Sequence, residues 1–262
     1  FVRLGVLGDW DNPYLTMNYK TEADIVRALG KIVSNGHMIK GYKPVYWSVV
    51  GGSALAEAEV EYQEKESFAI DVEFNVAERD KFLGVFSDLD RKKVADSVSV
   101  VIWTTTPWTL PSNQAVCLSA TLDYALVKID SYEKCKTILI ATEMIDEVMK
   151  RYDVEEYDVL AEVKGAALEN FELKHPFIDK NVPLILGEHV NTEAGTGAVH
   201  TAPDHGLDDF YVGQKYGIGT LNLVDENGLF SEDAGEFAEA HVYKVDEQII
   251  EKLKANKKLI AL

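Results

Sequence analysis

Cysteine is scarce in this chain, which has two cysteines, Cys117 and Cys135, among 262 residues. They form no paired spacing, so the sequence predicts no disulfide framework, and both are expected to be buried or incidental thiols of a cytosolic protein. No run of uncharged apolar residues is long enough to span a bilayer. No signal peptide opens the chain, and since it begins with Phe1 it is expected to be a fragment of a longer protein.

Basic residues are in deficit, because 26 Lys and Arg stand against 44 Asp and Glu, for a net charge of -18. Phosphate contacts need Lys and Arg, so this balance opposes a broad nucleic-acid-binding surface. Two local basic runs, 91–93 and 252–258, are interpreted as solvated faces. The hydrophobic fraction of 47% supports a packed core, and the length suits one large domain or two modest ones.

Several catalytic motifs are also missing. The spacing that begins Gly195-x-Gly197 would need glycine at position 200, where His200 stands, and no Gly-Lys-Ser/Thr occurs, so a phosphate-binding loop is excluded. There is no Gly-x-Ser-x-Gly turn and no cysteine beside a histidine motif, so no side chain is an obvious nucleophile. A positioned water is therefore the expected attacking group in any hydrolysis.

The apolar pattern predicts a β-rich mixed α/β domain with helices at its edges and no regular βαβ alternation. Helices are predicted over 22–36, 143–152, 206–217 and 242–258. Strands are predicted over 43–50, 54–62, 68–76, 97–106, 124–130, 136–142, 159–163, 182–187 and 195–202. The polar segment 78–97 is predicted to be a loop or an insertion.

The stretch WTTTPWTLPSN, from Trp103 to Asn113, is the first of two segments that suggest a functional site. The apolar run 100–102 before it predicts a strand, and Pro107 and Pro111 forbid a regular continuation. The strand therefore delivers three threonine hydroxyls to its end, where the chain turns sharply. On local composition alone, a Thr-rich edge strand with a proline turn is the simplest explanation.

The stretch AGTGAVHTAPDHGLDD, 194–209, is the second. It crowds together His200, Asp204, His205, Asp208 and Asp209. A metal site is one interpretation, although no His-x-His or His-Glu-x-x-His pattern appears. In the other interpretation Asp204 caps the following helix, and two further acids lie in its first turn, where the helix dipole favours carboxylates. Helix capping explains neither a second acid in that turn nor a histidine at the end of a strand.

Together the two stretches resemble the signature segments of the editing domain of isoleucyl-tRNA synthetases, a domain inserted into the catalytic domain through connective peptides. RLGVLGDWDNPYLTM and SALAEAEVEY resemble the same family, so the resemblance spans the whole chain. In the related valine and leucine enzymes the first segment resembles Thr-Thr-Arg-Pro, where this chain has Thr-Thr-Pro-Trp. Their second segment lacks the histidine after Gly-Ala-Val. The resemblance implies that 1–262 is an editing domain with a barrel-like sheet and peripheral helices. In it 1–52 and 243–262 would connect to the catalytic domain.

The activity implied by this resemblance is hydrolysis of the ester of valyl-tRNA(Ile), with hydrolysis of valyl-adenylate left open. A pocket for isoleucine rejects valine only weakly, and isoleucyl-tRNA synthetases are the standard case in which a second, smaller pocket must exclude isoleucine by size. The implied partners are the acceptor end of tRNA(Ile), the valine moiety and the rest of the synthetase, in the cytoplasm. The acidic fragment alone is expected to bind tRNA weakly.

The resemblance assigns roles to five residues of the first stretch. Thr104, Thr105 and Thr106 would line the site that receives the terminal adenosine and the aminoacyl group. Trp108 would be an apolar wall for the valine side chain, and Asn113 a polar contact. The resemblance implies that Thr105 and Thr106, together with His200 and Asp209, are the catalytic residues.

In the second stretch the resemblance assigns roles to two residues. His200 would narrow the pocket, and Asp209 would pair with the α-ammonium of the substrate. The attacking water would be assisted by the ribose hydroxyl of the terminal adenosine, while His200 as a general base stays open.

The motifs by which the family binds zinc and uses ATP are absent. Many members carry Cys-x-x-Cys after the position of Trp47, as half of a zinc knuckle, where this chain has Ser48 to Gly51, so no metal is expected. His-Ile-Gly-His and Lys-Met-Ser-Lys-Ser are missing, so ATP would be used only by the absent catalytic domain. Two alternatives remain open: a metal-dependent hydrolase built on His200, His205 and the aspartates, and a catalytically silent module that docks the tRNA acceptor end.

Overall fold

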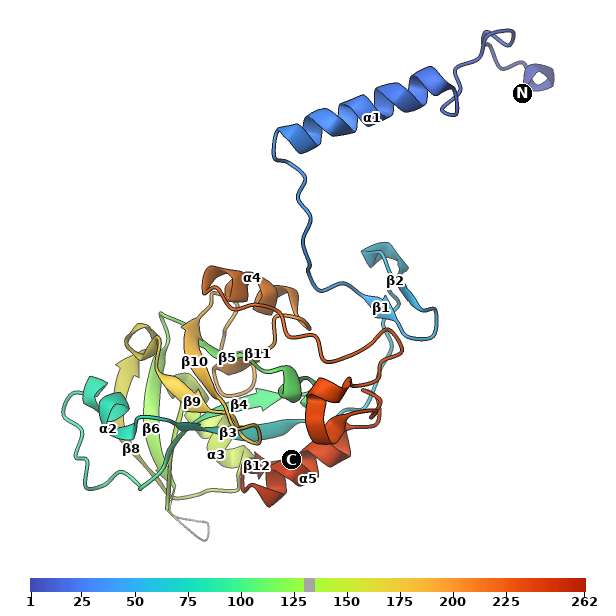
Figure 1. The fold of residues 1–262 in the computed structure, drawn as a ribbon. Coiled ribbons are helices and arrows are strands. Elements are labelled where there is room, and N and C mark those ends of the chain that lie inside the picture. Colours follow the sequence, from blue (N-terminus) through green and yellow to red (C-terminus); the bar gives the residue numbers. More distant parts are fainter. Residues whose placement is uncertain (130–134) are drawn as a thin grey trace. The chain divides into compact units, whose positions relative to one another are not determined.

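The computed structural model describes residues 1–129 and 135–262, which form two compact units, Phe1–Tyr42 and Lys43–Leu262 (Figure 1). The first unit holds η1 (Val2–Leu4) and the helix α1 (Tyr19–Ser34). None of the residues of α1 is buried, so its apolar side chains are exposed. The helix ends before Gly36, whose φ of 74° is a conformation that favours glycine.

The second unit contains the remaining elements. Its strands are β1 (Trp47–Ser48), β2 (Ser53–Ala54), β3 (Ile70–Val76), β4 (Val98–Thr104), β5 (Ala115–Leu118), β6 (Asp123–Ile129), β7 (Lys136–Ala141), β8 (Tyr157–Lys164), β9 (Glu172–Lys174), β10 (Asn181–Leu186), β11 (Ala198–Thr201) and β12 (Leu259–Ala261). Its α-helices are α2 (Arg79–Phe82), α3 (Ile145–Arg151), α4 (Leu207–Lys215) and α5 (Asp246–Ala255). Its 3-10 helices are η2 (Glu57–Glu59), η3 (Leu83–Val85), η4 (Pro107–Ser112), η5 (Thr142–Met144), η6 (Gly165–Leu168) and η7 (Glu232–Phe237).

A mixed sheet organises this unit, in the order β11-β5-β10-β9-β3-β4-β7-β6-β8, with β12 added beside β3. The pairs β4–β7 and β5–β10 are parallel, and the other pairs are antiparallel. The predicted barrel-like sheet is wrong, since the two end strands, β11 and β8, do not pair with each other among the described residues. One edge of β3 is divided between β9 and β12, so the sheet branches where a closed barrel would need a continuous ladder.

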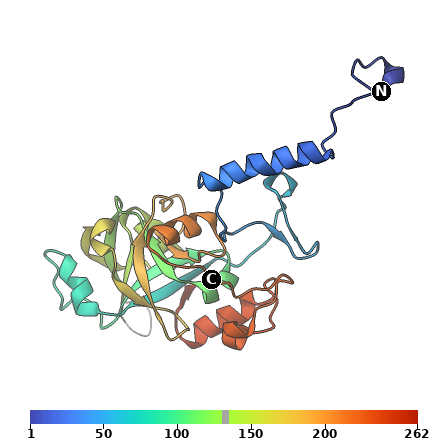
Figure 2. The same cartoon turned by 45° about the horizontal axis from the view of Figure 1, so that its top comes forward.

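The core surrounds the central strands of the sheet. β3, β4, β6 and β7 are buried along nearly their whole length, as is typical of strands covered on both faces. α3 and α5 add their apolar sides to the same core, through residues such as Val148 and Leu253. Figures 1 and 2 show α4 (orange) and α5 (red) at separate margins of this unit. No helix in the described part of the chain is both long and apolar enough to cross a membrane.

Most predicted elements are present with shifted ends. Of the predicted strand 43–50 only the two residues of β1 form a strand, and the predicted strand 54–62 is wrong, because β2 ends at Ala54 and η2 follows it. Within the predicted strand 54–62 the acids Glu57, Glu59 and Glu61 are exposed and the residues that alternate with them are not buried either, so the alternation reflects no buried face. The predicted loop 78–97 contains α2 and η3, and Asp130, the end of a predicted strand, lies outside the described residues.

The C-terminal helix α5 gives a stability prediction. Leu253 is fully buried, so Leu253→Ala should lower the free energy of unfolding by about 2–5 kcal/mol through lost burial and the cavity left behind. Lys254→Ala, at the exposed neighbouring position, should change it by less than about 0.5 kcal/mol. Urea unfolding of both variants is the measurement. Equal stabilities would show that α5 does not belong to the core.

Candidate active site

A cavity of about 210 Å³ lies where the two motif segments meet. It is lined by Trp103, Thr104, Thr106, Thr109, Val199, His200, Ala202, His205 and Asp209. Four of the seven predicted site residues are therefore in its wall: Thr104, Thr106, His200 and Asp209. The end of β4, the 3-10 helix η4, β11 and the start of α4 supply these side chains.

Strand pairing brings the two segments together. β11 runs antiparallel to β5, with His200 opposite Val116 and Thr201 opposite Ala115. The backbone N–H of Gln114 extends this pairing by donating to the Thr201 carbonyl oxygen at 2.9 Å. Since β5 directly follows η4, the residues of the first segment lie beside those of the second.

The threonine hydroxyls turn the chain at the end of β4. Thr104 Oγ1 accepts a hydrogen bond from the backbone N–H of Thr106 at 3.1 Å and lies 3.3 Å from Thr106 Oγ1. Thr109 Oγ1 donates to the Thr106 carbonyl oxygen at 2.9 Å. Thr105 is exposed and does not line the cavity. The three consecutive threonines therefore differ in position. Thr104 and Thr106 form the turn and line the cavity, whereas Thr105 lies on the surface beside it.

His200 is a buried polar residue of the wall, with 8% of its surface exposed. Its Nε2 lies 2.7 Å from Thr109 Oγ1, and its Nδ1 lies 3.1 Å from Asn113 Nδ2. Burial, together with the neighbouring His205, lowers the pKa of His200 to about 4. The imidazole is therefore neutral at pH 7.

Two predicted contacts, Trp108 and Asn113, lie behind the wall and do not line the cavity. The Trp108 ring packs edge-on against the His205 ring, with centroids 4.9 Å apart, and its backbone N–H donates to Asp246 Oδ1 at 3.0 Å. Asn113 is fully buried and bonds His200. Each of these residues therefore contacts a histidine of the wall.

Asp209 lies in the first turn of α4 and lines the cavity, whereas Asp208 is exposed. Asp209 Oδ2 accepts a hydrogen bond from the backbone N–H of Ala202 at 2.9 Å. Burial raises the pKa of Asp209, and this backbone hydrogen bond opposes the rise. The predicted cap by Asp204 is wrong, because the N-cap is Gly206 and no side chain caps the helix.

The remaining wall residues were not among the predicted site residues. His205 appeared only as a possible metal ligand, and Trp103, Thr109, Val199 and Ala202 were not singled out. Thr109 could have been predicted from its spacing. Residues three apart in a 3-10 helix lie on the same side, and Thr109 comes three residues after Thr106, the N-cap of η4. The apolar residues carry no comparable signal.

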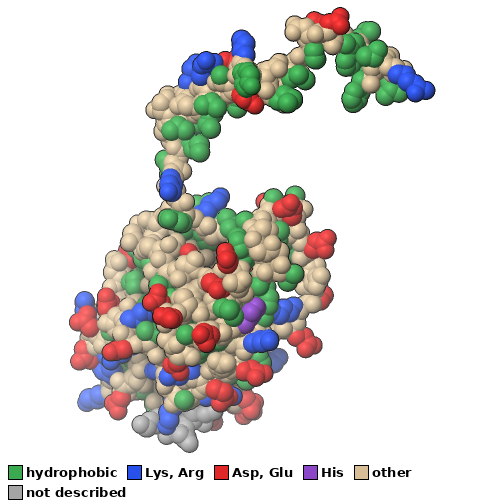
Figure 3. Space-filling model, turned by 45° about the vertical axis from the view of Figure 1, so that its right-hand side comes forward, with side chains coloured by type: hydrophobic (Ala, Val, Ile, Leu, Met, Phe, Trp, Pro, Cys, Tyr) green, Lys and Arg blue, Asp and Glu red, His purple; other side chains and the backbone are tan. Residues whose placement is uncertain are grey.

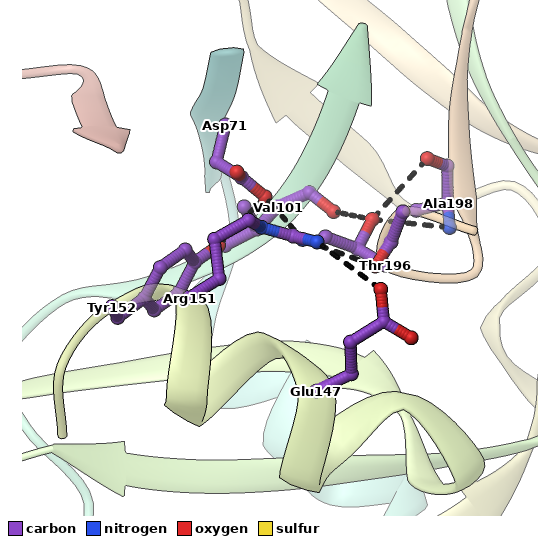
Figure 4. A network of polar contacts seen from close by, with 8 residues as sticks. Asp71, Val101, Glu147, Arg151, Tyr152, Thr196 and Ala198 are labelled. Atoms are coloured by element: carbon purple, nitrogen blue, oxygen red, sulfur yellow. Dashed lines mark hydrogen bonds and ion pairs between the residues drawn. The ribbon is translucent and has the colours of Figure 1, made fainter. Parts of the chain in front are cut away.

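A buried polar network holds the turn that precedes β11 (Figure 4). The Arg151 guanidinium donates to Asp71 Oδ1 at 2.9 Å and to the Gly195 carbonyl oxygen at 3.1 Å. Thr196 Oγ1 donates to the Val101 carbonyl oxygen at 2.6 Å, which ties the turn to β4. These bonds fix where β11 starts and so where its histidine lies.

The metal-binding alternative has no matching geometry. Within 1–129 and 135–262, no three His, Cys, Asp or Glu side chains converge closely enough to hold a metal ion. The residues at the zinc-knuckle positions also do not fit a zinc ion, because Ser48 offers a hydroxyl and Gly51 no side chain. Ser48 Oγ instead accepts the backbone N–H of Gly51 at 3.0 Å within the β1–β2 hairpin.

The fold of this chain is that of the editing domains of leucyl-tRNA synthetases. The solved structure of GlLeuRS-CP1 matches with a TM-score of 0.59 at 13% identity, over 73% of this chain and 97% of that chain. The P. knowlesi cytosolic leucyl-tRNA synthetase editing domain matches with a TM-score of 0.51 at 9% identity, over 74% and 96%. At these identities the likeness concerns the fold alone.

Residues 1–255 match the family of class I tRNA synthetases (I, L, M and V), and the chain belongs to this family. It is 56% identical to the isoleucine–tRNA ligase of Marinomonas sp. and 59% identical to that of Teredinibacter turnerae, over 260 residues in each case. Each match covers 99% of this chain, and the chain spans 27% of the length of those relatives. The predicted resemblance to isoleucyl-tRNA synthetases is thus confirmed.

The buried histidines give a prediction for the pH dependence of stability. Burial lowers the pKa of His175 to about 3 and those of His200 and His205 to about 4, below the value of about 6.5 in an unfolded chain. The unfolded state therefore binds more protons between these values, and stability that is complete above pH 6.5 is lost as the pH falls toward 4. Each histidine should contribute about 2 kcal/mol of this loss between pH 6.5 and 5.

Urea unfolding at pH 7, 6 and 5 measures this effect, and two variants separate its source. His175→Gln should make the decline shallower by about 1.4 kcal/mol per pH unit, because one of the three buried imidazoles is gone. His37→Gln, at an exposed position of the first unit, should leave the slope unchanged. The explanation is wrong if the two variants decline in parallel.

Proposed function

We propose that this chain carries the post-transfer editing activity of an isoleucine–tRNA ligase, namely hydrolysis of the ester of valyl-tRNA(Ile) with exclusion of isoleucine by size. This proposal rests on the small cavity, whose wall contains Asp209, His200 and the threonine hydroxyls. The family membership and the fold support it.

The cavity suits an aminoacyl group in both size and polarity. Its volume of about 210 Å³ admits a small branched side chain together with its ammonium and ester groups. Trp103, Val199 and Ala202 supply an apolar wall for the branched side chain. Asp209 supplies a carboxylate for the ammonium, because one of its oxygens is used by the Ala202 backbone and the other is available to the substrate.

Hydrolysis in this site would use water as the nucleophile. The water oxygen attacks the ester carbonyl carbon, the bond from that carbon to the ribose oxygen breaks, and the ribose hydroxyl is restored with a proton from the water. The substrate's own neighbouring ribose hydroxyl assists this transfer. We assign Thr105 and Thr106 to the terminal adenosine, since both are exposed at the end of β4 and Thr106 also lines the cavity.

The tRNA would contact this chain mainly through its acceptor end. On the face drawn in Figure 3, acidic and basic side chains are interspersed over the second unit. Together with the net charge of -18, this favours a local contact over a broad phosphate-binding surface. We assign 1–52 and 243–262 as the segments leading toward the ATP-using catalytic domain, with the whole synthetase in the cytoplasm.

Asp209 tests the proposed substrate contact. Asp209→Asn keeps the shape and removes the charge, and since charge-assisted hydrogen bonds contribute about 1.5–3 kcal/mol, release of valine from valyl-tRNA(Ile) should slow by about ten- to a hundredfold. Asp208→Asn is the matched control, because its side chain is exposed and should matter little. Thermal melts must show both variants folded. If Asp208→Asn is the slow variant, the carboxylate is misassigned.

His200 tests exclusion by size. His200→Ala removes several heavy atoms from the wall, and one methylene is worth about 1–3 kcal/mol of discrimination in an apolar pocket. The folded variant should therefore gain release of isoleucine from isoleucyl-tRNA(Ile) while it retains release of valine. Loss of valine release without any gain toward isoleucine would show that the histidine has a catalytic or structural role and does not act by size.

A further inference from the structure

We propose that Asn113 is a positioning residue, which holds His200 in a single neutral tautomer and a single ring orientation. The imidazole then forms a fixed wall of the cavity and does not serve as a base. The tautomer follows from the contacts alone, whereas its consequence for selectivity rests on the proposed editing function. Asn113 is fully buried and does not line the cavity, so it acts through the histidine and does not touch the substrate.

The amide group fixes one ring nitrogen. Asn113 Nδ2 lies 2.8 Å from the Ala115 carbonyl oxygen, which can only accept, so the atom at this position must be the NH2 of the amide. The same NH2 lies 3.1 Å from His200 Nδ1. Because an NH2 group can only donate, Nδ1 must accept, and it carries no hydrogen.

The hydroxyl of Thr109 fixes the other nitrogen. Its one hydrogen is donated to the Thr106 carbonyl oxygen at 2.9 Å. The oxygen can therefore only accept from His200 Nε2, 2.7 Å away, so Nε2 carries the hydrogen. The two partners lie in different parts of the first motif segment, and each independently requires the same tautomer.

A proton has no favourable place on this ring. Protonation of Nδ1 would replace the Asn113 hydrogen bond by a clash of two donors inside a buried site. The titratable and charged groups around it are His205 and Asp209 in the cavity wall, His175, and Lys180, whose ammonium donates to the Asn113 carbonyl oxygen. Burial and His205 disfavour the imidazolium, in line with a pKa of about 4. Both ring nitrogens are thus occupied, and neither can take a proton from water.

His175 offers a comparison within the same molecule. Its Nδ1 accepts the backbone N–H groups of Phe177 and Ile178 at 3.3 and 3.0 Å, and its Nε2 lies 3.0 Å from the Leu110 carbonyl oxygen. The backbone alone therefore sets the same tautomer at His175. A change at Asn113 should alter His200 and leave His175 as it is.

Multiple-bond 15N–1H NMR spectra of the 262-residue chain, labelled at histidine, test the tautomer at pH 7 without any tRNA. The His200 signals are assigned with His200→Gln. We expect the Nε2–H form for His200 and for His175. In Asn113→Asp the side chain loses the hydrogens that Asn113 donates to His200 Nδ1 and to the Ala115 carbonyl oxygen, so the His200 Nδ1 signal should shift away from that of an accepting nitrogen while His175 is unchanged. A wild-type His200 that is imidazolium or protonated on Nδ1, or one that does not respond to Asn113→Asp while His175 reports a folded chain, would overturn the proposal.

Deacylation then tests the consequence for selectivity. In Asn113→Ala the ring loses one of its two anchors, so the preference for valyl- over isoleucyl-tRNA(Ile) should fall by about tenfold, within the range that one methylene is worth. Asn75→Ala is the matched control, because its amide oxygen accepts from Ser99 and Lys258 far from the cavity wall. An unchanged preference in a folded Asn113→Ala would overturn the positioning role. A wild-type chain that releases neither amino acid would count against the editing function, while the NMR result would still decide the tautomer.

Discussion

β5 and β11 pair antiparallel from Ala115 opposite Thr201 to Leu118 opposite Ala198, and the site depends on this pairing. It joins a segment that turns out of β4 to one that lies far along the chain. The polar network around Arg151 and Thr196 holds the turn before β11, and the Gln114 N–H holds the other end by donating to the Thr201 carbonyl oxygen. A slip by one residue would point His200 to the other face of the sheet and empty the wall of the cavity.

Burial makes the histidines of this region neutral at pH 7 and holds their rings in place. Burying an imidazole removes its ability to take up a proton near pH 7, and the fold compensates by satisfying both ring nitrogens of His175 and of His200. The wall thereby becomes rigid and uncharged, while Asp209 supplies the carboxylate of the cavity. In the proposed function, the carboxylate binds the ammonium of the amino acid ester, and the fixed neutral histidine limits the size of the side chain that fits.

Several residues of the candidate site could be predicted because they lie within two short sequence segments. The resemblance of two short segments to a known family pointed to Thr104, Thr106, His200 and Asp209, and these four residues line one cavity. The supporting role of Asn113 could not be predicted, since it depends on a strand register that no local pattern encodes. The mixed α/β class was predicted correctly, but the predicted barrel-like sheet was wrong, because one edge of β3 is shared by β9 and the distant strand β12 and the sheet does not close. The alternation of acids from Glu57 to Glu61 misled, because exposed residues alternate without forming a sheet.

In the proposed function, this cavity admits valine esters and excludes isoleucine esters. Single-turnover release of the amino acid from valyl-tRNA(Ile) and isoleucyl-tRNA(Ile), measured side by side with the wild-type chain at equal concentrations, tests it most directly. We expect that valine is released and that isoleucine stays esterified over the same period. Equal release of both amino acids would contradict exclusion by size, and release of neither would contradict the editing activity itself.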